Sequence, residues 1–159
     1  MTPNGRRTVK LEFNSVFEMV DFVQIVSDHM GRSVGLDEDS LHWVGVAIRE
    51  SVINAIKHGN RHDVAKHVFV QFDATLQDAA PELTISVRDQ GEGFDPEEVA
   101  NPLAPENLLK SSGRGIFLIR NFMDDVRLQR AAEGGMEIRM VKRAPGTADG
   151  STAAPDSPR

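Results

Sequence analysis

The sequence contains no cysteine and no long hydrophobic run. Without cysteine, the chain has neither a disulfide scaffold nor a thiolate metal site. No apolar stretch approaches the roughly 20 residues that a membrane-spanning helix requires. The opening stretch, MTPNGRRTVK, contains basic side chains but no apolar segment behind them, so we predict no secretory signal. These absences favour a cytoplasmic protein that has no membrane partner.

The chain also lacks an excess of positive charge. Its formal net charge is −6 at pH 7, and its isoelectric point is near 5.3. Proteins that bind nucleic acid directly usually carry net positive charge or a basic face, so we expect no direct nucleic-acid partner. The chain has 159 residues, of which 40% are hydrophobic and 26% are charged. This composition is typical of one globular domain with a sizeable core.

The hydrophobic patterns predict a chain that contains both strands and helices. Alternating apolar residues predict strands at 7–13, 67–76, 82–89, 125–132 and 136–143. Helical spacing predicts helices from Ser15 to Gly31, from Asp37 or Asp39 to His58, and over 115–123. A lid-like loop with one short helix is expected between 94 and 112.

This order of elements is not the strict β-α-β alternation of a doubly wound sheet. It predicts a two-layer α/β sandwich, in which helices cover one face of a mixed, mostly antiparallel sheet. We expect one domain over residues 1–143. The remaining residues, 144–159, are rich in Pro, Gly, Ser and Ala and predict a disordered tail.

The stretch DQGEGFDPEE, residues 89–98, combines glycines with acids at the end of a predicted strand. Glycines in this position often hold phosphate, but the loop has five acidic residues and no basic one, so it would repel phosphate. A calcium loop is the rival interpretation, but the ligand spacing and terminal Glu of an EF-hand are missing. Asp89 can accept a hydrogen bond from an exocyclic amine such as that of adenine. Gly91 and Gly93 would let a flat ring approach the backbone.

The predicted helix LHWVGVAIRESVINAIKHGN, residues 41–60, has two different faces. One face is apolar and consists of Leu41, Val44, Ile48, Val52 and Ala55. Glu50, Asn54 and His58 recur every four residues on the other face, which in most helices would simply be solvated. Here Trp43, Val46 and Ala47 share the arc, so we expect this face to be covered. An Asn oxygen suits Mg²⁺ that phosphates already balance in charge, and Glu50 could accept a proton from a nucleophile.

The segment SSGRGIFLI, residues 111–119, places two glycines around Arg114 where a helix is predicted to begin. Free backbone N–H groups and the helix dipole favour an anion at such a position. A plain helix start that happens to contain glycines is the alternative. Together with the acidic loop and the Glu-Asn face, the segment predicts a phosphate site.

Three motifs resemble those of the GHKL, or Bergerat-fold, ATP-binding superfamily, and within it the bacterial anti-sigma-factor serine/threonine kinases. They are E-x-x-x-N-A-x-x-H-G from Glu50 to Gly59, D-x-G-x-G-F-D-P from Asp89 to Pro96, and S-G-R-G-I-F-L-I-R-N-F-M-D from Ser112 to Asp124. The segment APENLLK, 104–110, also looks like this subgroup's lid. The similarity covers roughly residues 7–143, with the motifs in the family's order.

The resemblance implies ATP and Mg²⁺ as cofactors and assigns roles to the matched residues. Glu50 would be the catalytic base, Asn54 the metal ligand and Asp89 the reader of adenine. The full set of implied cofactor-binding residues is Asn54, His58, Asp89, Gly91, Gly93, Ser112, Gly113, Arg114, Gly115 and Ile116. Such kinases usually have Thr where the last strand opens, but this chain has Met136. Either adenine binding is weaker here, or water and Asp89 suffice.

The resemblance also implies two protein partners and is compatible with a homodimer. The partners are an alternative sigma factor, which the protein sequesters, and a small STAS-type anti-anti-sigma protein, which it phosphorylates on Ser or Thr. Two other functions remain open. A nucleotide-responsive regulatory binding module without kinase activity would have no need of Glu50. The ATP-binding half of a histidine kinase would need a phosphoacceptor His, but His29 lacks the usual acid and proline beside it.

Overall fold

The computed structural model describes residues 5–76, 80–93 and 119–145. In chain order the elements are β1 (Arg6–Asn14), α1 (Met19–Ser33), α2 (Glu38–Asn54), the π turn η2 (Ala55–Gly59), β2 (His67–Thr75), β3 (Glu82–Arg88), β4 (Asp125–Arg130) and β5 (Met136–Arg143). Residues 119–122 are also helical. All five predicted strands are present. The predicted lid and all but the first two residues of the predicted tail lie outside the described residues.

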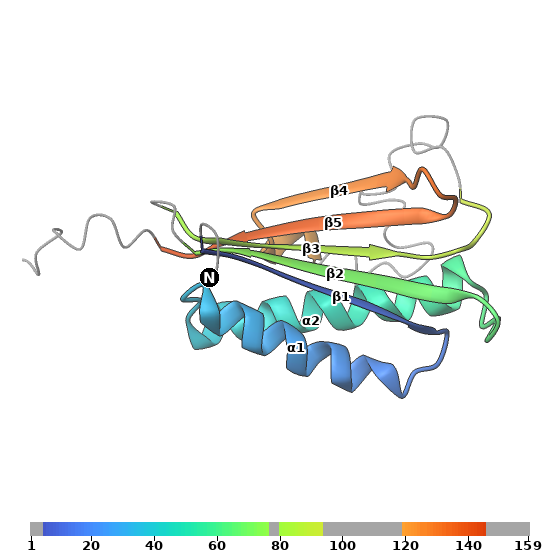
Figure 1. Ribbon diagram of the computed structural model, residues 1–159, viewed down its shortest axis with the longest axis horizontal. Coiled ribbons are helices and arrows are strands. Elements are labelled where there is room, and N and C mark those ends of the chain that lie inside the picture. The colour runs from blue at the N-terminus through green and yellow to red at the C-terminus, as the bar shows by residue number, and fades with distance from the viewer. Residues whose placement is uncertain (1–4, 77–79, 94–118, 146–159) are drawn as a thin grey trace, which may run out of the picture.

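The described strands form one sheet in the order β1-β2-β3-β5-β4, and each of its pairings is antiparallel. Strand β5 lies between β3 and β4 (Figure 1), so the sheet joins distant parts of the chain. Ile85 of β3, for example, pairs with Phe72 on one side and with Met140 on the other. This register places apolar side chains of three strands in one row.

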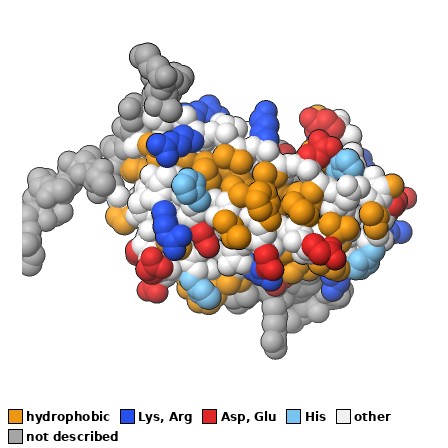
Figure 2. Space-filling view, turned by 60° about the horizontal axis from the view of Figure 1, so that its bottom comes forward, with side chains coloured by type: hydrophobic (Ala, Val, Ile, Leu, Met, Phe, Trp, Pro, Cys, Tyr) orange, Lys and Arg blue, Asp and Glu red, His pale blue; other side chains and the backbone are white. Residues whose placement is uncertain are grey.

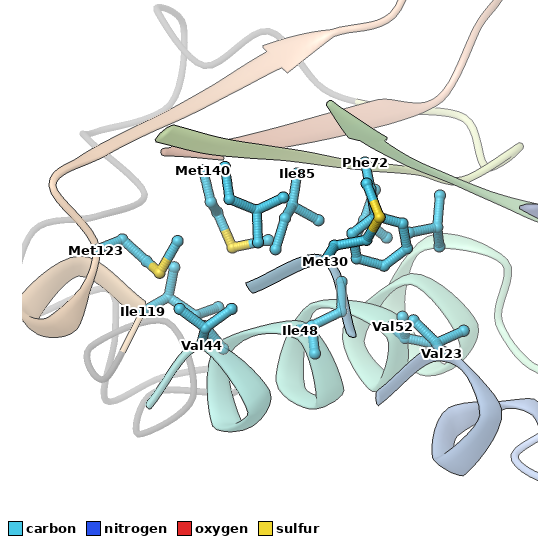
Figure 3. Packing of buried hydrophobic residues seen from close by; sticks show 14 of the residues in the cluster. Val23, Met30, Val44, Ile48, Val52, Phe72, Ile85, Ile119, Met123 and Met140 are labelled. Carbon is cyan, nitrogen blue, oxygen red and sulfur yellow. The ribbon is translucent and has the colours of Figure 1, made fainter. Parts of the chain in front are cut away.

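The helices α1 and α2 pack on one face of the sheet (Figure 1), and the core lies between the two layers. Strand β2 alternates between buried and half-buried residues along its whole length, as expected for a strand with one covered face. Figure 3 shows Val44 and Ile48 of α2 pointing toward Ile85 and Met140 of the sheet. The predicted two-layer α/β sandwich is therefore confirmed, but its described sheet is wholly antiparallel and not mixed.

The start of α1 differs from the prediction. We expected Ser15 to cap this helix, but the helix begins at Met19 and has no side-chain cap. The Ser15 hydroxyl instead donates to the carbonyl of Lys66 at 2.7 Å. Ser15 therefore joins the end of β1 to the segment before β2, because a serine hydroxyl can bond any nearby backbone carbonyl and not only a helix terminus.

The beginning of α2 agrees with one of its two predicted starts. Asp37 is the N-cap, and its carboxylate accepts a hydrogen bond from the backbone N–H of Ser40 at 2.7 Å. This satisfies one of the free N–H groups at the helix start, and the carboxylate pKa lies below its usual value because of these hydrogen bonds from Ser40. The predicted apolar face of α2 is buried, from Leu41 to Ala55.

The helical side of the molecule carries several exposed hydrophobic residues. Figure 2 shows hydrophobic side chains across the middle of this side, with acidic and basic side chains around them. Among the described residues, the exposed large hydrophobic side chains are Phe22 and Ile25 of α1, Phe17 before α1, and Val64 between η2 and β2. Within the described part of the chain, no helix has the length and apolar character needed to cross a membrane.

The core predicts a sharp contrast between two isoleucines. Ile48 of α2 has 0% exposure, whereas Ile25 of α1 is 65% exposed. Ile48→Ala should lower the free energy of unfolding by about 2–5 kcal/mol, since it removes buried methyl groups and leaves a cavity. Ile25→Ala is the matched control and should change it by about 0.5 kcal/mol or less. Urea denaturation of both variants measures the difference, and equal losses would contradict this packing.

Candidate nucleotide site

The polar face of α2 carries Glu50 and Asn54 one helical turn apart. Both side chains are half-buried, and their i, i+4 spacing places them on the same face. Trp43 lies on the same stripe, two turns before Glu50. Its ring stacks on Phe122, with centroids 3.7 Å apart and planes at 4°. Phe122 thus covers the start of the stripe, as expected for a face that is not fully solvated.

The helix ends in a π turn. The backbone N–H of Asn60 donates to the carbonyl of Ala55 at 2.7 Å, which is the i to i+5 bond of η2. Such single wide turns are frequent at functional sites. His58 lies in this turn and is exposed. The predicted i, i+4 spacing of Asn54 and His58 assumes an α-helical turn, whereas the structure has a π turn here; the role of His58 stays a prediction.

Asp89 follows β3 directly and is buried, with 6% exposure. Its Oδ1 accepts hydrogen bonds from the backbone N–H groups of Gly91 at 2.9 Å and Met136 at 3.1 Å. The Asp89 N–H donates in turn to the Met136 carbonyl at 3.0 Å. The first residue of β5 therefore holds Asp89 through its backbone. The effect of the Met136 side chain on adenine binding stays a prediction.

Three glycines pack directly against Asp89 or against each other. A Cβ atom at Gly59 would lie 2.0 Å from Asp89 Oδ2, and one at Gly135 would lie 2.2 Å from the Asp89 carbonyl oxygen. A Cβ at Gly91 would lie 2.1 Å from the carbonyl oxygen of Gly59. Since no real Cβ can approach so closely, each position requires glycine. The three glycines bring the end of α2 and the start of β5 onto Asp89.

Sequence patterns alone do not predict this close packing of glycines. From the sequence, Gly91 is expected only to let a flat ring approach the backbone. The signal was present, because a glycine stands after α2, after β3 and before β5, next to the point where each element meets the site. Gly93 has a positive φ of 72° and lies against Gly135. A Cβ atom at Gly93 would be 3.2 Å from the Gly135 carbonyl oxygen.

The structure brings together only part of the predicted site. Asp89 and Gly91 meet Gly59, just beyond the helix that carries Glu50 and Asn54, whereas Gly93 lies against Gly135 before β5. The predicted phosphate-binding residues lie outside the described residues and stay a prediction; they are Ser112, Gly113, Arg114, Gly115 and Ile116. In the described ranges, no three His, Cys, Asp or Glu side chains are grouped so as to hold a metal ion.

The contact between Gly59 and Asp89 generates a prediction. Gly59→Ala should displace the Asp89 carboxylate and lower the free energy of unfolding by about 1–3 kcal/mol, the usual cost of overpacking. Gly45→Ala is the matched control on the same helix. There a Cβ meets only the Gln24 side chain, at 3.1 Å, and alanine favours the helix by about 1 kcal/mol. Thermal unfolding compares the two, and a Gly59→Ala protein as stable as Gly45→Ala would contradict the contact.

Comparison with known proteins identifies the family. The family model described as "Histidine kinase-like ATPase domain" matches residues 17–142. The anti-sigma F factor of Bacillus velezensis is 33% identical over 141 residues, which cover 86% of this chain and 92% of that protein. The anti-sigma F factor of Bacillus subtilis is 32% identical over the same shares.

A second group of relatives has a different name. The serine-protein kinase RsbW of Bacillus licheniformis is 28% identical over 131 residues, which cover 79% of this chain and 78% of that protein. The prediction of ATP as a ligand agrees with the family that matches. The chain belongs to the family of histidine kinase-like ATPase domains.

Proposed function

We propose that this protein is an ATP-dependent serine/threonine protein kinase that is also an anti-sigma factor. The observation that carries the proposal is the placing of Asp89 against the end of the helix that bears Glu50 and Asn54. The end of this helix therefore meets Asp89, whose carboxylate can accept a hydrogen bond from a nucleotide base. Glu50 and Asn54 provide a carboxylate and an amide on the preceding turns. The relatives named anti-sigma F factor and serine-protein kinase RsbW support the same function.

Asp89 is the group that selects adenine. Its Oδ1 is occupied by two backbone N–H groups, from Gly91 and Met136. Its Oδ2 lies over Gly59, and the carboxylate can pack closely against the Gly59 backbone because glycine has no side chain. A carboxylate oxygen accepts from the exocyclic amine of adenine, whereas guanine offers a carbonyl oxygen at the corresponding ring position. Two acceptors would repel each other, so the site favours ATP over GTP.

Asn54 is the residue that would hold Mg²⁺. Its amide oxygen is a neutral hard ligand, and it stands on the half-buried face of α2 beside Glu50. A neutral ligand suits a cation that phosphate oxygens already balance in charge. When bound, Mg²⁺ neutralises charge on the phosphates of ATP. His58 and the residues Ser112, Gly113, Arg114, Gly115 and Ile116 belong to the proposed nucleotide site by their motifs.

Glu50 is the proposed catalytic base. It stands one turn before Asn54, so its carboxylate would face the phosphates that Asn54 and Mg²⁺ would hold. The hydroxyl of a Ser or Thr in the partner gives its proton to Glu50, and its oxygen attacks the γ-phosphorus. The bond to the bridging oxygen of ADP breaks as the new bond forms. A protein that only binds nucleotide would gain nothing from a carboxylate at this position.

The proposed partners are proteins. One is an alternative sigma factor that the protein sequesters, and the other is a small STAS-type anti-anti-sigma protein that it phosphorylates. A homodimer and a cytoplasmic location are parts of the same proposal. The names of the relatives support the two partner classes. Capture of bound proteins from the source cell, followed by mapping of phosphorylated residues, identifies both partners.

Glu50→Gln separates a kinase from a binding module. The amide keeps the size of the side chain but cannot accept the proton, so phosphoryl transfer should fall by about 10²–10⁴-fold. ATP and partner binding should remain, because Glu50 has no role in holding adenine. Transfer of labelled γ-phosphate to the captured small partner measures the rate, and calorimetry measures the affinity for ATP.

The control for this test is Glu38→Gln, the same chemical change in the exposed first turn of α2. It should leave the rate of transfer unchanged. If Glu50→Gln transfers phosphate as fast as the wild type, Glu50 has no part in the mechanism. If the wild type transfers no phosphate to any captured partner, the binding module without kinase activity is the better description.

Asp89→Asn tests the reading of adenine. Asparagine can keep Oδ1 as the acceptor for Gly91 and Met136, and it replaces only the oxygen that lies over Gly59. The binding free energy of ATP should become less favourable by about 1–3 kcal/mol, the cost of an unmatched polar contact. Asp63→Asn is the control, since Asp63 is exposed and its Oδ1 also accepts a backbone N–H, that of Ala65 at 3.0 Å. Calorimetry that finds the same ATP affinity in both variants would remove Asp89 from the site.

A further inference from the structure

Asn60 stands one residue beyond the π turn and has 0% exposure. Its side-chain amide forms hydrogen bonds on every side. Nδ2 donates to the Ser15 hydroxyl oxygen at 2.8 Å and to the His67 carbonyl at 2.9 Å. Oδ1 accepts from the backbone N–H of Gln90 at 2.7 Å. A buried amide with both N–H groups and its oxygen satisfied is a strongly specified feature.

The partners fix which way the amide points. The His67 carbonyl can only accept and the Gln90 N–H can only donate, so the amide nitrogen must face His67 and the oxygen must face Gln90. The Ser15 hydroxyl gives its own proton to the Lys66 carbonyl, and is therefore free to accept from Asn60. Aspartate would supply no donor here, and an apolar side chain would supply neither group. The pattern fits asparagine.

The three partners belong to different parts of the fold. Ser15 follows β1, His67 begins β2, and Gln90 comes directly after Asp89. Gln90 is held a second time, because its side-chain Oε1 accepts from the His67 N–H at 2.6 Å. We call this set of bonds among Asn60, His67 and Gln90 the Asn60 tether. It fixes the loop that carries Asp89 to the residue after Gly59.

We propose that Asn60 is a positioning residue for the nucleotide, and that the Asn60 tether sets the preference for adenine. This rests on the proposed function, in which Asp89 reads the base and Asn54 faces the phosphates. The base and the phosphates belong to one molecule, so the distance between Asp89 and α2 must be fixed before ATP binds. Gly59 brings Asp89 close to the helix end, and the Asn60 tether keeps its loop there. Without the tether, the hydrogen bond to adenine weakens more than the contacts to the phosphates.

The test compares ligands that contain the base with one that does not. In the full chain, Asn60→Ala should weaken ATP binding about tenfold, which corresponds to one lost polar contact. The ratio of ATP to GTP affinity should fall by a similar factor, whereas the affinity for inorganic tripolyphosphate should stay the same. Calorimetry is carried out well below the unfolding temperature of the variant. A general loss of stability would not change the ratio of the two affinities.

Asn14→Ala is the matched control. Asn14 lies at the end of β1, and its Nδ2 also donates to a backbone carbonyl, that of Val64 at 2.7 Å. It forms no hydrogen bond with Gln90 in the described structure. Asn14→Ala should therefore leave the ratio of ATP to GTP affinity unchanged, even if it destabilises the protein.

The outcomes distinguish this inference from the proposed function. If the wild type binds ATP and GTP equally, Asp89 does not read adenine, and the proposed site fails together with the inference. If the wild type prefers ATP and Asn60→Ala keeps that preference, only the positioning role fails. If Asn60→Ala does not fold, Gln90→Ala is the second variant. Gln90 is exposed, and this change removes only the hydrogen bond between its Oε1 and the His67 N–H. A lower ATP to GTP ratio in that variant supports the inference, and an unchanged ratio overturns it.

Discussion

The packing of Gly59 against the Asp89 carboxylate is the contact on which the candidate site depends. A side chain at Gly59 would come within 2.0 Å of Asp89 Oδ2, so the helix end and the strand end meet with nothing between them. Burying a carboxylate against backbone is unfavourable unless its oxygens are satisfied. The N–H groups of Gly91 and Met136 both donate to Oδ1 and so satisfy one of the two oxygens. The same two bonds also orient Asp89 Oδ2 toward Gly59. One arrangement thus both stabilises the buried carboxylate and orients the oxygen that is proposed to bind adenine.

This arrangement also explains why α2 cannot end as an ordinary α-helix. The chain must leave Asn54 on the half-buried face, deliver a glycine to Asp89, and then bury an asparagine amide between β1, β2 and the Asp89 loop. The π turn Ala55–Gly59 takes up one more residue per hydrogen bond than an α-helical turn. Arg61 and His62 follow with positive φ angles of 52° and 60°, which non-glycine residues rarely adopt. Such backbone persists where surrounding contacts hold it. Here the His62 N–H donates to the Ile56 carbonyl at 2.8 Å, and the Asp63 N–H donates to the Asn60 carbonyl at 3.0 Å.

The elements of this fold were predictable from sequence because their physical signals are local. The alternation in β2 and the apolar stripe from Leu41 to Ala55 are each visible within a single segment, because each segment has one face buried in the core. Glu50 and Asn54 were predictable for the same reason, since they lie on one helix. The end of α2 was not, because a π turn and an α-helical turn bury much the same apolar residues. Ser15 was misassigned because a hydroxyl that bonds Lys66 has the same sequence signal as one that caps a helix.

The contacts around Asp89 were beyond sequence reasoning because they join residues that are far apart in the chain. Gly59, Asp89 and Gly135 belong to three segments, and only the β3–β5 pairing brings the last two together. The order β3-β5-β4 places a strand from the end of the chain between two others, which no local pattern reveals. In the sequence, a glycine indicates a turn. Only the three-dimensional contacts show that it is needed because another part of the chain packs closely against it. Asn60 follows the same logic, since its side chain is recognised as a positioning group only when Ser15, His67 and Gln90 are seen to meet around it. A site of this kind is thus specified by the topology of the sheet as much as by the motifs that mark it.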